Sequence, residues 1–545
     1  MHNMTGMGVL YTLCALLLMQ FASLPGCQGA NILGVFGSES PSHLIVHMSL
    51  IKALADRGHN ITVVAALKPK LAPHENITVI VVPPSLEAQK MFNERVSKVT
   101  KEKTNVLMAL AKGFAQSNTM FQSQYDLTVH PKVKSIYENP QVKFDLLIIG
   151  YFMNDLQLGI AAKLNCPVII NWCGVPFEML DALVGNVNDP AHVPNFNMAL
   201  EKGQKTMSFR FRVKNFITYT IFKGLNMILN YHMNNYYKQA FGVDPDFPTL
   251  NDMKRRISLL FMNYHSHSEG PIRPSVPQSV ELGGIQIKDT PDPLPKDLAE
   301  FLDNASTHGA IFFSLGSNID TAYVKEEIIE HIYNVLSRLP QRVIWKWSDL
   351  SKTPGSASNI YYHNWLPQDD ILAHPNTKLF ITHAGKGGLA EAQFHGVPML
   401  ALPIFADQPG NAASMVASGF GLSLELLTLT EKNFENSIHE ILQNSTYKEK
   451  VGQFSSLYRD RPMTARKTAV YWTEYVLRHQ GAYHLQSPVI HMGFIARHNL
   501  DVYSLFILVI IALIWLLARI LRFVFRKVAR LLHGRVYSYQ KVKAN

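Results

Sequence analysis

An apolar strand that breaks directly into a glycine-rich helix start is the sequence feature that most constrains the fold. Lys378-Leu-Phe-Ile-Thr382 has the composition of a buried strand, and His383-Ala-Gly-Lys-Gly-Gly388 follows it. The first turn of a helix offers unpaired N–H groups and a partial positive charge, and glycine lets the backbone approach a ligand closely. This strand–turn–helix predicts a site for anionic phosphate.

Apolar strands and amphipathic helices alternate through most of the chain, which indicates parallel β-α-β units buried on both faces. A proline-rich passage over 271–295 predicts a boundary between two such domains, and 545 residues suit two domains with additions. Aromatic and Met-rich helices are predicted between 202 and 241. Strands are predicted at 32–36, 61–67, 144–149 and 167–171, and after the boundary at 310–315, 343–346, 379–382 and 399–403.

Both ends of the chain indicate a membrane protein. An apolar run over 9–21, followed by small residues, predicts a signal peptide over 1–29. A charge-free run begins at Val502, and we predict a transmembrane helix over 502–525. A basic tail over 526–545 follows, and it places the preceding domains in the lumen. Because basic residues after Asp501 account for most of the formal charge of +10, the charge does not indicate nucleic-acid binding.

Smaller signals agree with a luminal location. Lys541 and Lys543 resemble the dilysine retrieval signal of endoplasmic-reticulum membrane proteins. Outside the predicted signal peptide only Cys166 and Cys173 remain, which allows one bridge but no disulfide framework. Glycosylation sequons on the predicted luminal side lie at Asn60, Asn76, Asn304 and Asn444.

Residues around the strand–turn–helix complete a longer pattern, which consists in order of Trp365, Gln368, His383, Glu391 and Asp407-Gln408. This set resembles the nucleotide-sugar signature of the UDP-glycosyltransferases, the membrane-bound animal UDP-glucuronosyl and UDP-glucosyltransferases. The resemblance implies an α/β GT-B fold, in which two Rossmann-like domains face each other across a cleft. We expect an N-terminal acceptor-binding domain over 30–285, a C-terminal UDP-sugar-binding domain over 286–485 and a linker over 486–501.

The resemblance also implies the roles of the donor-binding residues. Trp365 is expected to stack on uracil beside Gln368, His383 to contact the pyrophosphate, and Glu391 to bind ribose hydroxyls. Asp407 and Gln408 are expected to bind the hydroxyls of the sugar. The site further includes Ser314, Gly316 and Ser317 of a second phosphate-facing turn, with Gly385 and Gly388. The chain departs from the family at Ala384, where Gly is usual, and at Gly387, where many members have Asn.

The expected chemistry is a single inverting displacement with His43 as general base. His43 follows the first predicted strand, and its spacing to Arg57-Gly-His59 resembles that of the catalytic His of the family. The acid that orients this His in vertebrate relatives falls at Gly150, so we assign that role to Asp155, the nearest acid. Although His43 and His47 lie four residues apart, no third ligand is evident, so no metal is predicted.

The predicted activity is transfer of glucose or glucuronic acid from a UDP-sugar co-substrate to a hydroxyl of small lipophilic acceptors, as in detoxification. No separate cofactor is expected, and self-association in the membrane is a property of relatives. A membrane lipid such as ceramide is an alternative acceptor, and the Gly150 and Gly387 departures motivate an inactive UDP-sugar-binding alternative. A remote alternative is an NAD-dependent dehydrogenase, because residues 385–390 fit G-x-G-x-x-A with Asp407 about 20 residues later. It leaves Trp365, Gln368 and His383 unexplained.

Overall fold

The computed structural model describes residues 29–70, 72–101, 106–195, 198, 206–242, 244–266, 273–319 and 321–543, so the signal peptide predicted at the N-terminus lies almost entirely outside the described residues. The chain divides into two compact units, one ending at Ser487 and one beginning at Pro488. Parallel sheets form the centre of the first unit.

The N-terminal sheet has seven strands in the order β3-β2-β1-β4-β5-β6-β7, and each neighbouring pair is parallel. Later strands are added on opposite sides of β1, so the strand order reverses between β1 and β4. The strands are β1 (Asn31–Phe36), β2 (Asn60–Ala65), β3 (Ile77–Val81), β4 (Leu146–Gly150), β5 (Val168–Trp172), β6 (Ile257–Met262) and β7 (Ser279–Glu281).

The C-terminal sheet has six strands in the order β10-β9-β8-β11-β12-β13, again with parallel neighbours. Its strand order reverses between β8 and β11. The strands are β8 (Ala310–Ser314), β9 (Arg342–Lys346), β10 (Ile360–His363), β11 (Thr377–Thr382), β12 (Met399–Ala401) and β13 (Gly421–Ser423).

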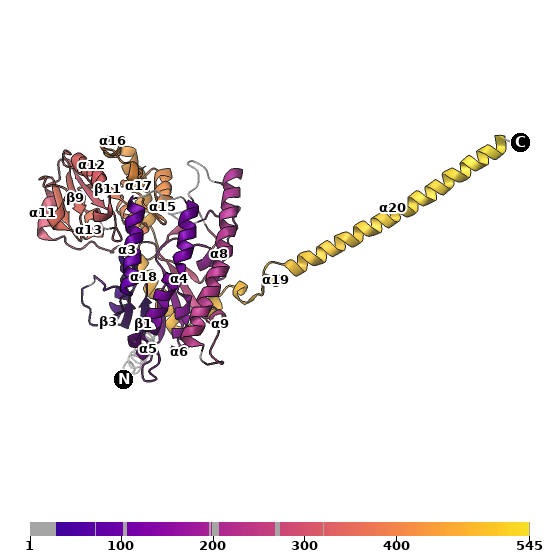
Figure 1. Cartoon of the computed structure of the whole chain (residues 1–545), viewed down its shortest axis with the longest axis horizontal. Coiled ribbons are helices and arrows are strands. Elements are labelled where there is room, and N and C mark those ends of the chain that lie inside the picture. Colours follow the sequence, from indigo (N-terminus) through magenta and orange to yellow (C-terminus); the bar gives the residue numbers. More distant parts are fainter. Residues whose placement is uncertain are drawn as a thin grey trace, which may run out of the picture. The chain divides into compact units, whose positions relative to one another are not determined.

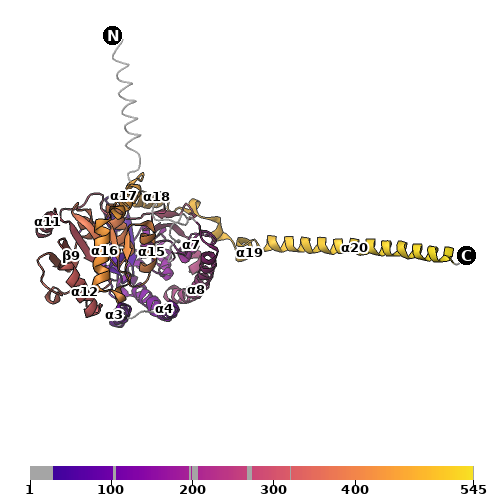
Figure 2. The same ribbon diagram turned by 90° about the horizontal axis from the view of Figure 1, so that it is seen from above.

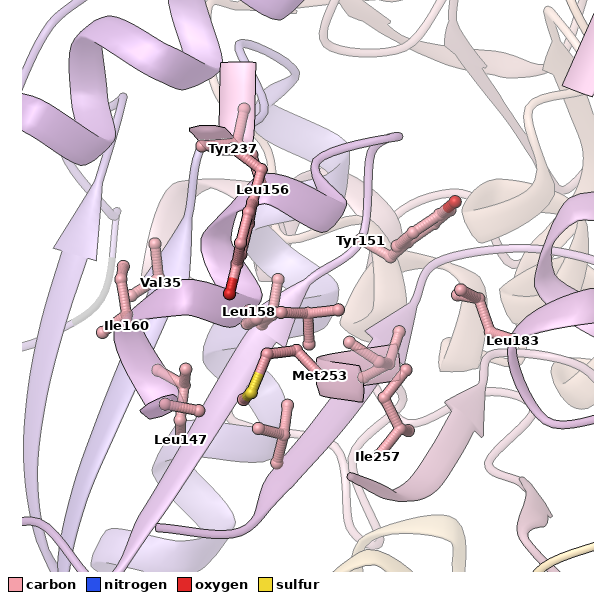
Figure 3. Packing of buried hydrophobic residues seen from close by; sticks show 14 of the residues in the cluster. Val35, Leu147, Tyr151, Leu156, Leu158, Ile160, Leu183, Tyr237, Met253 and Ile257 are labelled. Atoms are coloured by element: carbon pink, nitrogen blue, oxygen red, sulfur yellow. The ribbon is translucent and has the colours of Figure 1, made fainter. Parts of the chain in front are cut away.

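Helices cover both faces of the N-terminal sheet, as the continuous apolar strands predict. One face packs against α2 (Pro41–Ala55) and α18 (Ala465–Arg478). Figure 3 shows part of the core on the other face, where Leu158 and Met253 lie near Leu147 of β4. The helices there are α4 (Val106–Val129), α5 (Pro131–Tyr137), α6 (Leu158–Leu164), α7 (Glu178–Leu183), α8 (Phe209–Phe241) and α9 (Leu250–Lys254), with α4 and α8 side by side (Figure 1).

The C-terminal sheet is covered in the same way. One face packs against α12 (Glu326–Leu336) and α16 (Glu431–Gln443), which lie next to each other (Figure 2). The opposite face packs against α11 (Lys296–Asp303), α13 (Gln368–Ala373), α14 (Lys386–His395), α15 (Gln408–Ser418) and α17 (Ser445–Arg459).

Two helices join the domains across the predicted boundary. Although the sequence groups α18 with the C-terminal domain, Ala469 and Val476 of this helix are buried in the core that α2 forms with the N-terminal sheet. In the other direction, Val96 of α3 (Leu86–Lys101) enters the C-terminal core, and Thr100 Oγ1 donates to the Tyr323 carbonyl at 2.9 Å. Each domain therefore contributes a helix to the packing of the other.

The second unit contains α19 (Phe494–Arg497) and α20 (Leu500–Lys543). Leu500–His533 of α20 is long and apolar enough to cross a membrane, with a mean hydropathy of 2.8, and it includes the predicted span. It is the only such helix among the described residues.

Candidate functional site

Part of the predicted site lies at the carboxyl ends of strands where the strand order reverses. His43 follows β1, and Gly150 ends β4. In the other sheet, the turn with Ser317 follows β8, and His383 follows β11. Ligands of open parallel sheets bind at such positions, because loops from the two central strands diverge there.

His383 is held between two loops that approach it without side chains. A Cβ on Gly316 would lie 2.5 Å from Cε1 of the imidazole, and a Cβ on Gly385 would overlap Nε2. Gly316 also has a φ of +84°, which side chains disfavour. Nδ1 of His383 and Oγ of Ser317 are buried without a hydrogen-bond partner. Both atoms lie at the predicted phosphate site, and they suit an anion with several oxygens.

Lysines make this region electropositive. Lys346, at the end of β9, donates from Nζ to the Gly316 carbonyl at 2.5 Å, and burial and nearby Lys70 lower its pKa to about 8. Burial and Lys346 lower the pKa of His383 to about 4, so this imidazole is neutral at pH 7. Lys70 and Lys346 lie 3.7 and 5.2 Å from the centroid of the Trp365 ring. No sequence motif indicates either lysine.

Gln368 and Glu391, expected beside uracil and at the ribose, are hydrogen-bonded to each other. Gln368, the first residue of α13, donates from Nε2 to Oε2 of Glu391 in α14. Burial and neighbouring Asp369 raise the pKa of Glu391 to about 8. Glu391 is therefore mainly protonated at neutral pH, which allows its carboxyl group to donate as well as accept hydrogen bonds.

Asp407 and Gln408 lie at the start of α15. Oε1 of Gln408 accepts from the backbone N–H groups of Ile404 and Phe405 at 2.8 and 3.0 Å, so this side chain shapes the turn before the helix. Oδ2 of Asp407 accepts from Nδ2 of Asn411 at 2.6 Å, and burial raises the pKa of the carboxyl group.

Ala384 shows the physical reason for glycine at this position in the family. Its φ is +61°, in the left-handed region, and its side chain is buried. An L-residue in this conformation costs about 1–2 kcal/mol. Its carbonyl accepts from Nδ2 of Asn411 at 3.1 Å. Gly387, the second departure, has room for a Cβ, which would lie 3.8 Å from Nε2 of Gln286, an ordinary van der Waals contact.

The two halves of the site are joined by a hydrogen-bonded pair. Ser40, in the turn before His43, and Asn318, after the phosphate-facing turn, each donate to the other's side-chain oxygen at 3.1 and 3.0 Å. This contact holds the turn that leads to His43 against the phosphate-facing loop of the other domain.

His43 has a hydroxyl group as its polar partner. Its Nδ1 lies 3.1 Å from Oγ of Ser38, and its ring packs edge-on against Phe152 and Trp172 at centroid distances of 5.5 and 6.1 Å. Burial lowers the pKa of His43 to about 4, and no carboxylate contributes to the shift.

The expected pairing of His43 with Asp155 is not formed. Asp155 instead pairs with Lys254 of α9, with Oδ2 and Nζ 2.6 Å apart. The family position of the acid, Gly150, has no room for a side chain, because a Cβ there would lie 2.5 Å from Nε2 of His47. The His47 ring stacks on Phe36 and occupies this space. Sequence proximity suggested Asp155, but its location on the far side of the turn could not be inferred from spacing.

Buried amides fix the turn after β1. Gln124 of α4 donates to the Gly37 carbonyl at 2.8 Å and accepts from Gln157 at 3.1 Å. Gln157 in turn accepts from Asn154, which also donates to the Gly150 carbonyl at 3.0 Å. The network joins the turn before His43 to the end of β4, and no sequence motif indicates it.

Other predicted positions are also located. Asn60, Asn304 and Asn444 are exposed, whereas Asn76 is half-buried and donates to the Ala55 carbonyl at 3.4 Å. Cys166 and Cys173 are free thiols. Within the described ranges, no group of three His, Cys, Asp or Glu side chains could hold a metal ion.

Two parallel α/β domains with loops converging from both define the GT-B fold. The solved structures of the calicheamicin glycosyltransferase CalG4 and of the kitacinnamycin glycotransferase share this fold, with TM-scores of 0.51 and 0.53 at 16% identity; each match covers 83% of this chain and 99% of the other. The family model for UDP-glucoronosyl and UDP-glucosyl transferase matches residues 34–534. The chain belongs to this family.

Relatives from insects and mammals support the assignment. The chain is 33% identical to "UDP-glycosyltransferase UGT5" of Dactylopius coccus, over 94% of this chain and 95% of the relative. It is 30% identical to "UDP-glucuronosyltransferase 2B15" of Homo sapiens, over 90% and 92%. The family identity confirms the predicted hexosyltransferase class and leaves no support for the dehydrogenase alternative.

Proposed function

We propose that this transferase moves glucose or glucuronic acid from its UDP-sugar to a hydroxyl of a small lipophilic acceptor, with inversion and without a metal. The observation that carries the proposal is the Ser40–Asn318 pair, which holds the turn before His43 beside the phosphate-facing loop. A base and a leaving-group site on facing loops are what a direct displacement requires.

In this mechanism, Nε2 of His43 accepts the proton of the hydroxyl while the oxygen attacks the anomeric carbon. The bond from that carbon to the β-phosphate oxygen breaks, and UDP leaves with the electron pair. Lys346 and the N-terminus of α14 stabilise the charge that develops on the phosphate. The transition state has oxocarbenium character, as in other glycosyl transfers.

The donor residues are proposed in the roles that the resemblance gives them. Uracil would stack on Trp365, which requires Lys70 to leave the ring face that it now covers. His383, Ser317 and the first turn of α14 would contact the diphosphate. Gln368 would lie beside the uracil, Glu391 would bind the ribose hydroxyls, and Asp407 and Gln408 would bind the hydroxyls of the sugar.

We further infer a single-pass type I protein of the endoplasmic-reticulum membrane, with luminal catalytic domains and self-association as a further possibility to test. The apolar helix α20 and the basic residues after it support the orientation. The retrieval role of Lys541 and Lys543 rests on the sequence alone.

A UDP-sugar-binding protein without turnover is the second candidate function. The specific observation in its favour is that no carboxylate contributes to the pKa of His43, whereas Asp155 pairs with Lys254. An imidazolium that forms at His43 therefore lacks the stabilisation that a carboxylate gives.

UDP release from membranes that contain the full chain tests the proposal. UDP-glucose and UDP-glucuronic acid are each supplied with phenolic, steroid and ceramide acceptors, and His43→Ala is assayed in parallel. Acceptor-dependent release that is lost in the variant supports the transferase mechanism and identifies the donor. UDP binding without release for any acceptor instead supports the binding protein.

A further inference from the structure

We propose that Ser38 takes the place of the orienting carboxylate as the positioning residue of His43, and that this hydroxyl–imidazole pair selects acidic hydroxyl groups, above all phenols, as acceptors. This inference rests on the proposed transferase function and names its acceptor class.

The space normally available for a carboxylate is closed. A side chain on Gly150 would meet the His47 ring, which stacks on Phe36 at a centroid distance of 4.7 Å and lies 3.0 Å from Asn171 through Nδ1. Because these contacts fix the His47 ring, it cannot move aside easily. The end of β4 therefore contributes only backbone to the surroundings of His43.

Ser38 occupies a position from which it can orient the imidazole. Its side chain is buried, and its Oγ accepts from the Ser40 N–H at 3.3 Å. The remaining lone pair can accept from Nδ1–H of His43 at 3.1 Å, which leaves the lone pair of Nε2 for the acceptor proton. Gln124 donates a hydrogen bond to the adjacent Gly37 carbonyl, which fixes the backbone that carries the Ser38 hydroxyl.

The pair provides orientation but no negative charge. On its own helix, the ionisable side chain that interacts with His43 is His47, which is neutral because burial lowers its pKa to about 3. Beyond Trp172, the Tyr151 hydroxyl lies beside Asp155, whose charge Lys254 balances. Proton transfer to His43 is consequently uphill, and more so for weaker acids.

The acidity of the acceptor hydroxyl therefore distinguishes good acceptors from poor ones. A phenol resembles the tyrosine side chain, with a pKa of about 10, whereas an aliphatic alcohol is closer to water at about 15.7. The phenol proton passes to Nε2, the oxygen bonds to the anomeric carbon, UDP departs, and the imidazolium returns its proton to solvent. The rings of Phe152 and Trp172 beside His43 supply apolar walls that suit an aryl group.

The test compares phenol with cyclohexanol, and phenols of graded acidity, using the full chain in membranes and both UDP-sugars. Ser38→Ala removes the partner, and Ser38→Asp supplies a carboxylate at the same place. Ser49→Ala, on the outer part of α2, the helix that carries His43, is the control. We expect kcat/KM for phenol to exceed that for cyclohexanol at least 100-fold in the unaltered protein.

Ser38→Ala is expected to lower kcat about 10-fold without changing KM for the UDP-sugar, because the variant loses one orienting hydrogen bond. Since His43 must be neutral to act, the unaltered protein should retain activity at pH 5.5. Ser38→Asp should raise the pKa of His43, abolish activity at pH 5.5 and reduce the phenol preference at least 10-fold.

Turnover of phenol and cyclohexanol within threefold of each other overturns the inference even if Ser38→Asp fails to fold. So does a Ser38→Ala variant with unchanged kcat. Failure of the proposed function looks different, because the unaltered protein would then release no UDP with any acceptor, which overturns both proposals.

Discussion

At the scale of single residues, the proposed phosphate site requires glycine at two positions beside His383, because a side chain there would displace the imidazole. Replacing Gly316 or Gly385 with alanine places a methyl group against the His383 ring, whereas the matched change Gly387→Ala makes only an ordinary contact with the Gln286 side chain. We expect the first two variants to weaken UDP binding at least 10-fold and the third to leave it within twofold, as isothermal titration calorimetry can measure. Equal effects of all three would show that the position of His383 does not govern nucleotide binding.

The residue scale also marks what sequence can and cannot predict about this site. The strand–turn–helix pattern around His383 predicts a phosphate site, whereas the roles of Glu391 and of the Ser314–Ser317 turn come from the family resemblance. Ser38 and Lys346 have no motif, and they become recognisable only when β1 and β9 bring them beside His43 and Gly316. Sequence proximity predicts Asp155 as the acid that orients His43, but the turn after β4 directs its carboxylate to Lys254.

At the scale of elements, α4 controls the turn before His43 through one buried amide. Gln124→Ala leaves the Gly37 carbonyl and the Gln157 amide without their partner, at a cost of about 1–3 kcal/mol. We expect thermal unfolding at lower temperature and a kcat reduced about 10-fold, because the turn loses its anchor. Gln122→Ala, two residues away on the exposed side, is the matched control. An unchanged kcat in Gln124→Ala would separate this network from catalysis.

Lys288 and Asp292, in the segment between the two domains, form polar contacts with the first turn of α13. Lys288 pairs with Asp370, whose side chain is 3% exposed, and with Asp292, whose side chain is 69% exposed. Asp370 also accepts from the Asp292 N–H at 2.7 Å. We expect Asp370→Asn to lower the free energy of unfolding by about 2 kcal/mol and Asp292→Asn to leave it nearly unchanged. Differential scanning fluorimetry compares the two, and similar melting temperatures would contradict this account.

The elements themselves were predictable where the pattern was long and apolar. The central strands of both sheets follow from uninterrupted apolar runs such as Leu146–Gly150. These runs correctly predict the α/β class, whereas the GT-B fold is implied by the family resemblance. β7 and β13 have three residues each, which is too short for periodicity to be distinctive, and neither strand is predicted. The return of α18 to the N-terminal sheet is a long-range packing choice that boundary signals in the local sequence do not encode.

At the scale of the whole molecule, the fold explains how the proposed acceptor site of one domain and the proposed donor site of the other form a single active site. Each sheet reverses its strand order at its centre, and the loops from the two reversal points meet through Ser40 and Asn318. The contributions of α3 and α18 to the opposite domain further restrain the pair. The proposed reacting groups are thus positioned by the relation between domains, and Leu500–His533 of α20 is long and apolar enough to cross a membrane.

The orientation in the membrane gives the last prediction. If the first unit is luminal, exposed sequons should carry N-glycans, so digestion with endoglycosidase H should increase the mobility of the chain, and the sensitivity itself indicates retention in the endoplasmic reticulum. We expect Asn304→Gln and Asn444→Gln each to remove one step of this shift. Asn76→Gln should remove a smaller fraction, because Asn76 is half-buried and its amide nitrogen donates to the Ala55 carbonyl, which opposes its use as an acceptor of glycan. When sealed microsomes are treated with protease, the protein should lose only an epitope placed after residue 545, because that end would face the cytosol. A chain without any glycan whose first unit is digested in sealed microsomes would reverse the assigned topology.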